Sequence, residues 1–169
     1  MNLEKWEAEI VQWNHINGIK PSVERQAFFV QCESDEFRNA TGIDKMIEAG
    51  DYAFVAIFHA YLLKKINSDW HTGIIECMNH IRRLNAESFV DATIKSNWTK
   101  YVHNSQTNMD KMSLEAAILE EKYKGRYKQV VPIRSGDYYF IRGLEKDAQG
   151  EWHEKVLKPS SFREAKEFI

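Results

Sequence analysis

The sequence predicts a mainly α-helical protein with a small β appendage at its C-terminal end. Apolar residues recur at spacings of three and four through roughly residues 1–125, which indicates amphipathic helices. The composition then changes, and short runs rich in β-branched and aromatic residues alternate with turn signals. We therefore predict two parts, a helical domain at 1–125 and a β appendage with a tail at 126–169.

The first two helices are delimited by turn-forming and capping residues. Gly18 and Pro21 end the first helix, whose apolar residues are Leu3, Trp6, Ile10 and Trp13. Ser22 is a suitable N-cap for a second helix, which we expect to run to about Ala40 and to be closed by Gly42.

A third helix is predicted from Asp44 to about Ile66. It carries a stripe that we expect to face the core, formed by Ile47, Asp51, Val55, Phe58 and Leu62. The turn at 67–69 ends it, and a shorter helix through 74–81 follows.

Two further helices complete the predicted helical domain. We expect one at 86–100 with Asn85 as its cap, and another that starts at Ser113 and ends near Gly125.

Strands are predicted in the last part of the chain. Residues 129–133 and 137–142 read as a hairpin around the Ser135-Gly136 turn. A second turn at 146–150 precedes a strand at 152–157, and the tail follows Pro159.

Composition limits the classes of function. The net charge of -2 argues against a general nucleic-acid binder, which usually has an excess of basic residues. Cys32 and Cys77 are isolated thiols, which indicates a reducing compartment. The N-terminus does not resemble a signal peptide, and the apolar stretch at 52–63, which contains His59, is too short to span a bilayer. We expect a soluble, cytoplasmic protein that binds neither membrane nor nucleic acid.

Two carboxylate pairs are the most informative feature of the chain. Glu33 with Glu36, and Glu48 with Asp51, are each spaced i, i+3, so each pair shares one face of its predicted helix. Apolar residues stand three or four positions away: Phe29, Val30, Phe37, Ala40, Ile47, Tyr52, Phe54 and Val55. Carboxylates on such stripes repel one another unless a cation lies between them, and an all-oxygen site suits Mg²⁺, with Mn²⁺ as the alternative.

Two simpler interpretations of these carboxylates stay open. A single E-x-x-E pair is usually a solvated helix face, and a buried salt bridge to Arg25, Arg38 or Lys45 is the other alternative. Zinc is disfavoured because the histidines and cysteines show no ligand spacing.

The carboxylate pattern resembles a known family, the all-α nucleoside triphosphate pyrophosphohydrolases, which include MazG and the dimeric dUTPases. Their signature is E-x-x-E, a spacer, then E-x-x-D on antiparallel helices; here it is Glu33-Ser34-Asp35-Glu36 and Glu48-Ala49-Gly50-Asp51. The run 96–100 (Ser-Asn-Trp-Thr-Lys) and the Lys158-Pro159 pair are similar to phage-type MazG-like proteins. Members often have Glu-Glu where this chain has Cys32-Glu33, so the number of metal ions stays open.

The resemblance implies an antiparallel helical bundle and a Mg²⁺-dependent enzyme that cleaves a (d)NTP to a (d)NMP and pyrophosphate. Glu33, Glu36, Glu48 and Asp51 would hold the metal, and Glu33 or Glu36 would act as the catalytic base. The further substrate-binding candidates are Asn97, Lys100, Trp13 and Tyr52. A rival Asn-x-x-Lys run stands at Asn108 to Lys111, and each aromatic is also a candidate for the core.

The resemblance also implies a homodimer or homotetramer, because base pockets in the family often form between subunits. Two alternative functions stay open. One is phosphoribosyl-ATP pyrophosphohydrolase, whose second motif is similar to residues 48–54. The other is a catalytically silent MazG-like helical interaction module.

Overall fold

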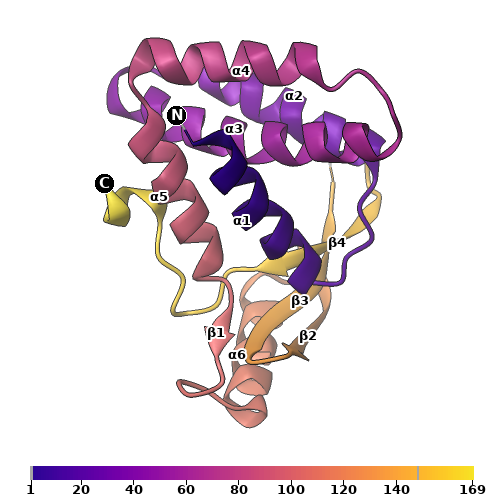
Figure 1. Ribbon diagram of the computed structural model, residues 1–169. Helices are drawn as coiled ribbons and strands as arrows, with labels where there is room; N and C mark the ends of the chain where they lie inside the picture. Colours follow the sequence, from indigo (N-terminus) through magenta and orange to yellow (C-terminus); the bar gives the residue numbers. More distant parts are fainter. Residues whose placement is uncertain (1, 148) are drawn as a thin grey trace. The chain divides into compact units, whose positions relative to one another are not determined.

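The computed structural model describes residues 2–147 and 149–169 (Figure 1). The described chain is mainly helical, with an antiparallel four-stranded sheet in its C-terminal part, which confirms the predicted fold class at this level. It divides into two compact units. Unit 1 comprises 1–15, 20–97 and 164–169, and unit 2 comprises 16–19 and 98–163.

Unit 1 is built from five helices and a terminal 3-10 turn. These are α1 (Leu3–Ile16), α2 (Val23–Asn39), α3 (Gly42–Lys65), α4 (His71–Leu84), α5 (Glu87–Trp98) and η1 (Ala165–Phe168), with the last residues of α1 and α5 assigned to unit 2. The α3 helix contributes the most to the core, because ten of its residues are buried. Fully buried Trp6 and Ile10 of α1 also belong to this core.

The α2–α3 pair forms a tight helical hairpin. Ser22 caps α2 as predicted, since its hydroxyl accepts the backbone N–H of Arg25. Only Ala40 and Thr41 separate the two helices, and so short a connection makes them antiparallel neighbours. Phe37 of α2 stacks on Tyr52 of α3 with ring centroids 6.0 Å apart.

Two local predictions in unit 1 were wrong. Asn85 does not start a helix; it ends α4 in the left-handed conformation with φ 53°, a role that asparagine tolerates. On α3, Asp51 and Val55 are not among the buried residues but share a half-buried stripe with His59, while the buried residues lie on the rest of the helix circumference.

The α3 helix is also longer than the apolar stretch predicted at 52–63. Its 24 residues are long and apolar enough to cross a membrane by length and composition, and 56% of its most apolar window is buried inside the protein. The core helix of a soluble protein meets the same criterion.

Unit 2 contains one long helix and the sheet. Its elements are β1 (Val102–His103), α6 (Met109–Lys122), β2 (Tyr127–Ser135), β3 (Tyr138–Lys146) and β4 (Trp152–Leu157). The central strand is β3, which pairs with β2 along one edge and with β1 and then β4 along the other. Met112 and Ala116 of α6 pack into a core with Val130, Tyr139, Ile141 and Leu157.

The two units do not divide at the predicted position near residue 125. Helix α6 belongs with the sheet because its apolar face is buried against β2 and β3, a tertiary contact that local sequence does not reveal. The predicted start of this helix at Ser113 was also late. Its N-cap is Asn108, whose side chain accepts the backbone N–H of Lys111.

Candidate metal centre

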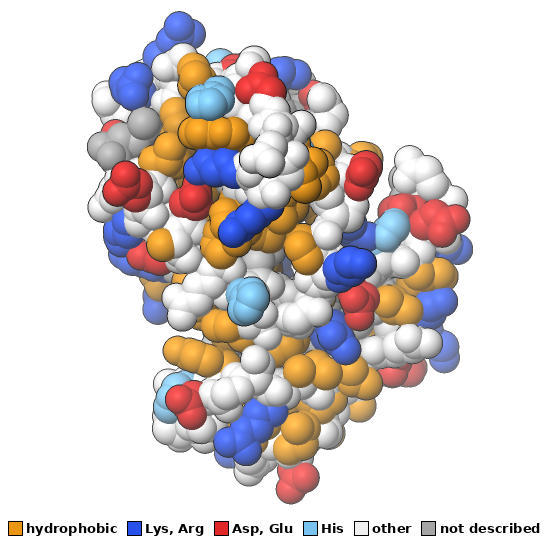
Figure 2. Space-filling view, turned by 45° about the vertical axis from the view of Figure 1, so that its right-hand side comes forward, with side chains coloured by type: hydrophobic (Ala, Val, Ile, Leu, Met, Phe, Trp, Pro, Cys, Tyr) orange, Lys and Arg blue, Asp and Glu red, His pale blue; other side chains and the backbone are white. Residues whose placement is uncertain are grey.

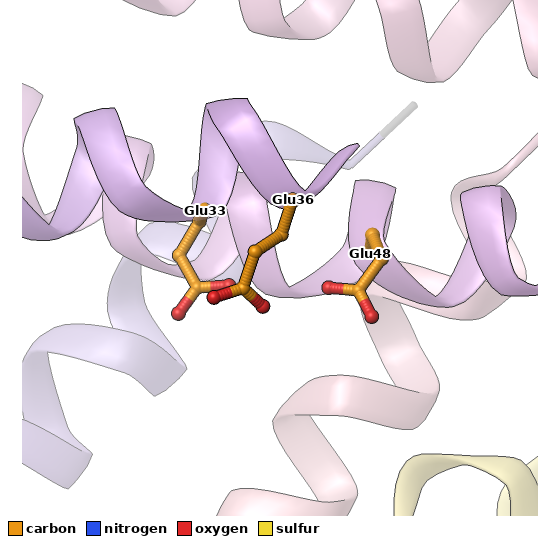
Figure 3. Close-up of side chains that lie close together, drawn as sticks. All are labelled: Glu33, Glu36 and Glu48. Atoms are coloured by element: carbon orange, nitrogen blue, oxygen red, sulfur yellow. The ribbon is translucent and has the colours of Figure 1, made fainter. Parts of the chain in front are cut away.

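Three of the predicted carboxylates converge on one side of the α2–α3 hairpin. One carboxylate oxygen from each of Glu33, Glu36 and Glu48 lies within 4.8 Å of the other two. Figure 3 shows the two α2 side chains side by side, with the Glu48 carboxylate directed toward them from α3. The i, i+3 spacing brings Glu33 and Glu36 together, and the antiparallel hairpin brings Glu48 to them.

This cluster lies at the boundary between core and solvent. Glu36 is exposed, whereas Glu33 and Glu48 are half-buried. Immediately behind them on α2, Ser34 and Phe37 are buried, so the acidic face of the helix adjoins its apolar face. The position beside the apolar stripe agrees with the prediction from sequence.

The electrostatics of the cluster disfavour the charged form of Glu48. Burial raises the pKa of the Glu48 carboxyl above its ordinary value, and the negative charges of Asp51, Glu36 and Asp44 raise it further. Every one of these causes acts in the same direction, so a bound cation would relieve both the desolvation and the repulsion.

Asp51, the fourth predicted ligand, is half-buried like Glu48 and follows it by three residues on α3. Its charge acts on Glu48, which places it in the electrostatic surroundings of the cluster. It is not among the three side chains whose oxygens meet within 4.8 Å.

Two of the cations considered as salt-bridge partners make other contacts. Arg38 lies 3.4 Å from Asp35 and 4.0 Å from Glu76. Lys45 lies 4.8 Å from the centre of the Phe37 ring, with its Nζ 3.5 Å from the Ala40 carbonyl oxygen. Among the described residues, neither forms an ion pair with Glu36 or Glu48.

The aromatic candidates Trp13 and Tyr52 lie in the core of unit 1. The Trp13 indole N–H donates to the Asn97 carbonyl oxygen at 2.8 Å, and its ring meets Phe54 edge-on. Burial raises the pKa of Tyr52 to about 12, and its side chain is hydrogen-bonded to Ser34. Both residues therefore support the helices that carry the site.

The structure assigns Asn97 and Lys100 to different units. The Asn97 side chain donates to the Thr93 carbonyl oxygen within α5, and Lys100 lies 5.8 Å from the centre of the Phe162 ring in unit 2. The rival run has a structural explanation, because the Asn108-to-Lys111 spacing is that of the α6 N-cap.

One contributor was missed in the sequence. Asp44 stands four residues before Glu48 on α3, and its charge helps to raise the Glu48 pKa. The i, i+4 spacing of Asp44 and Glu48 is the sequence signal that points to this contribution.

Comparison with known proteins does not place the chain in a family. No protein-family model matches it, no curated protein matches it, and no solved structure matches it. The class that the described residues define is therefore a mainly helical protein whose α2–α3 hairpin carries a cluster of carboxylates.

Proposed function

We propose that this protein is a Mg²⁺-dependent nucleotide pyrophosphohydrolase of the MazG-like all-α type, which cleaves a (d)NTP to a (d)NMP and pyrophosphate. The observation that carries the proposal is the convergence of Glu33, Glu36 and Glu48 within 4.8 Å on an antiparallel helical hairpin. That hairpin is the arrangement implied by the resemblance of the two motifs. As part of the same proposal, the protein is of the phage type of MazG-like proteins. It forms a homodimer or homotetramer and is located in the cytoplasm.

The donor set fits a hard divalent cation. Carboxylate oxygens are the ligands that Mg²⁺ and Mn²⁺ prefer, and the half-buried Glu48 is destabilised in its charged form by its acidic neighbours. Glu33, Glu36 and Glu48 would hold the ion, with Asp51 as a fourth ligand or as a partner for its water molecules. A bound Mg²⁺ supplies charge neutralisation to phosphate oxygens and lowers the pKa of a coordinated water.

The chain's own groups supply positioning and proton transfer. Glu33 and Glu36 lie one helical turn apart, and one of these two ligands would double as the base that accepts a proton from the attacking water. The antiparallel hairpin fixes the distance between the α2 and α3 carboxylates, which keeps the acceptor aligned with the substrate.

The test is release of pyrophosphate from a panel of NTPs and dNTPs, with Mg²⁺ and with EDTA. We expect release only with Mg²⁺, and a fall in kcat of about 100-fold or more in Glu33→Gln and in Glu48→Gln. Asp35→Asn is the matched control, because Asp35 lies on the same helix but is exposed and contacts Gln31 and Arg38. It should retain wild-type activity.

The panel also decides between the alternatives. If pyrophosphate is released from phosphoribosyl-ATP but from no (d)NTP, the substrate is phosphoribosyl-ATP and not a nucleoside triphosphate. A protein that releases pyrophosphate from neither, and that melts at the same temperature with Mg²⁺ and with EDTA, would be the silent helical module instead.

A further inference from the structure

Unit 1 contains a groove of about 400 Å³ along α1 and the C-terminal half of α3. Its lining is mainly apolar and is formed by Leu3, Ala8 and Val11 of α1, by Tyr61 of α3, and by Trp70, the residue before α4. Small-molecule sites in proteins have volumes of this order and a mainly apolar lining with a few polar groups. The groove is therefore large enough for a small organic molecule.

Three charged side chains complete the lining, and such mixing of apolar and charged side chains is visible on the face shown in Figure 2. The Lys64 ammonium group lies 2.6 Å from a carboxylate oxygen of Glu7 and 4.3 Å from the centre of the Trp70 ring. The third is Glu4, which lies one helical turn before Glu7, is exposed, and forms no ion pair with any residue that the structure describes. With two carboxylates and one ammonium group, the lining favours a cation over an anion.

The contacts of Lys64 indicate which chemistry this groove recognises. A carboxylate and the face of an aromatic ring both attract an organic ammonium ion, and Lys64 is held by one of each. Glu4 and Tyr61 provide a second carboxylate and a second ring in the same groove. Lys65 lies 5.2 Å from the centre of the Tyr61 ring, but it is exposed and does not line the groove. An anionic ligand, in contrast, would have to compete with Glu7 for Lys64.

The groove is separate from the carboxylate cluster on the α2–α3 hairpin. Tyr61 follows Glu48 by 13 residues on the same helix, which at a rise of about 1.5 Å per residue is about 20 Å along α3. None of the residues that line the groove belongs to the cluster. A small molecule in the groove therefore binds independently of a metal ion at the carboxylates.

We propose that this groove is a second binding site, which takes a primary amine with an aromatic body. The ammonium group of the ligand pairs with the Glu4 carboxylate, and the aromatic body packs on the apolar lining beside Ala8, Val11 and Tyr61. The proposal goes beyond the enzyme activity and does not depend on it, so either one stands if the other fails.

Titration of the ¹⁵N-labelled full chain with phenethylamine, followed by NMR of the tryptophan indole N–H signals, tests this site. The Trp70 signal, assigned with Trp70→Phe, should shift saturably, whereas the signal of Trp152 in unit 2 should not shift. Glu4→Gln should bind about threefold more weakly, because it removes an exposed charge that pairs with the ammonium group. In the wild type, uncharged 2-phenylethanol should bind more weakly than the amine, and anionic 3-phenylpropionate more weakly still.

Glu9→Gln is the matched control, because Glu9 lies on the same helix but pairs with Lys5 and does not line the groove. It should bind phenethylamine as tightly as the wild type. Ala8→Phe places a bulky ring in the groove from an exposed position, so it should abolish the Trp70 shift. The proposal is wrong if the Trp70 signal does not shift or if 2-phenylethanol binds as tightly as phenethylamine. It is also wrong if Glu4→Gln and Glu9→Gln weaken binding equally.

Discussion

Gly50 of α3 lies so close to Thr93 of α5 that a Cβ atom at position 50 would be 2.5 Å from the Thr93 Oγ1 atom. The same Cβ would be 2.7 Å from the carbonyl oxygen of Phe89. Gly50 stands between Glu48 and Asp51, so the absence of a side chain there lets α5 pack directly behind the part of α3 that carries the carboxylates.

Gly50→Ala should therefore destabilise the protein by about 1–3 kcal/mol, because the new methyl group overlaps backbone as well as side-chain atoms. Urea denaturation followed by circular dichroism measures the change. The matched control is Gly73→Ala in α4, where a Cβ meets nothing within 4 Å. That variant should be stabilised by up to about 1 kcal/mol, since alanine is the better helix former. Equal stabilities of the two variants would refute the close packing.

The Thr93 hydroxyl is a second feature of the same helix contact. Thr93 is 1% exposed, and its Oγ1 atom has no hydrogen-bond partner among the described residues. Thr93→Val removes this polar atom and keeps the shape, so we expect stability that is unchanged or higher by about 1 kcal/mol. A melting curve of the variant beside the wild type checks this, and a loss of more than about 1 kcal/mol would indicate that the hydroxyl is bonded after all.

Much of the fold could be predicted because its signals are local. Ser22 marked the start of α2, and the Ser135-Gly136 turn marked the β2–β3 hairpin, since capping and turn residues act over three or four positions. Asn85 was misassigned because asparagine suits both a helix start and a left-handed helix end.

The candidate site could be predicted as two pairs, but its geometry could not. The spacing of Glu33 and Glu36 is a property of one helix, whereas the approach of Glu48 depends on the α2–α3 hairpin. The half-buried position of Asp51 depends on which side of α3 is covered by the other helices of unit 1. The burial of Trp13 and Tyr52 depends on the same packing, which periodicity along one helix does not determine.

The N-cap of α6 gives a prediction for unit 2. The Asn108 side chain accepts the Lys111 backbone N–H at 3.0 Å, so Asn108→Ala leaves a helix-terminal donor without its partner. We expect a loss of about 1 kcal/mol in the free energy of unfolding. Asn108→Asp is the control that keeps a capping oxygen. If both substitutions have the same effect, the cap does not stabilise the helix.

The raised pKa of Glu48 makes stability depend on pH. Because the folded protein binds this proton more tightly than the unfolded chain, the contribution to stability is fully present below the unfolded value of 4.5. It is lost as the pH rises through the higher pKa of the folded state. Glu48→Gln should remove this decline and make the protein more stable than the wild type near neutral pH. Denaturation at a series of pH values above 4 tests this. If the free energy of unfolding varies with pH in the same way in the wild type and in Glu48→Gln, the pKa of Glu48 is not raised by folding.

Metal binding should act on the same carboxylates with the opposite dependence on pH. A cation that binds only the folded state stabilises it by about 2.7 kcal/mol at a concentration 100 times its dissociation constant, so Mg²⁺ or Mn²⁺ should raise Tm in the absence of any nucleotide. The shift should vanish in Glu36→Gln and Glu48→Gln and persist in Asp35→Asn. It should also fall as the solution is acidified toward pH 4.5, because protons compete for Glu48. A thermal shift series over metal concentration and pH measures all three effects. An increase in Tm that is equal in every variant would mean that the ion binds elsewhere on the protein.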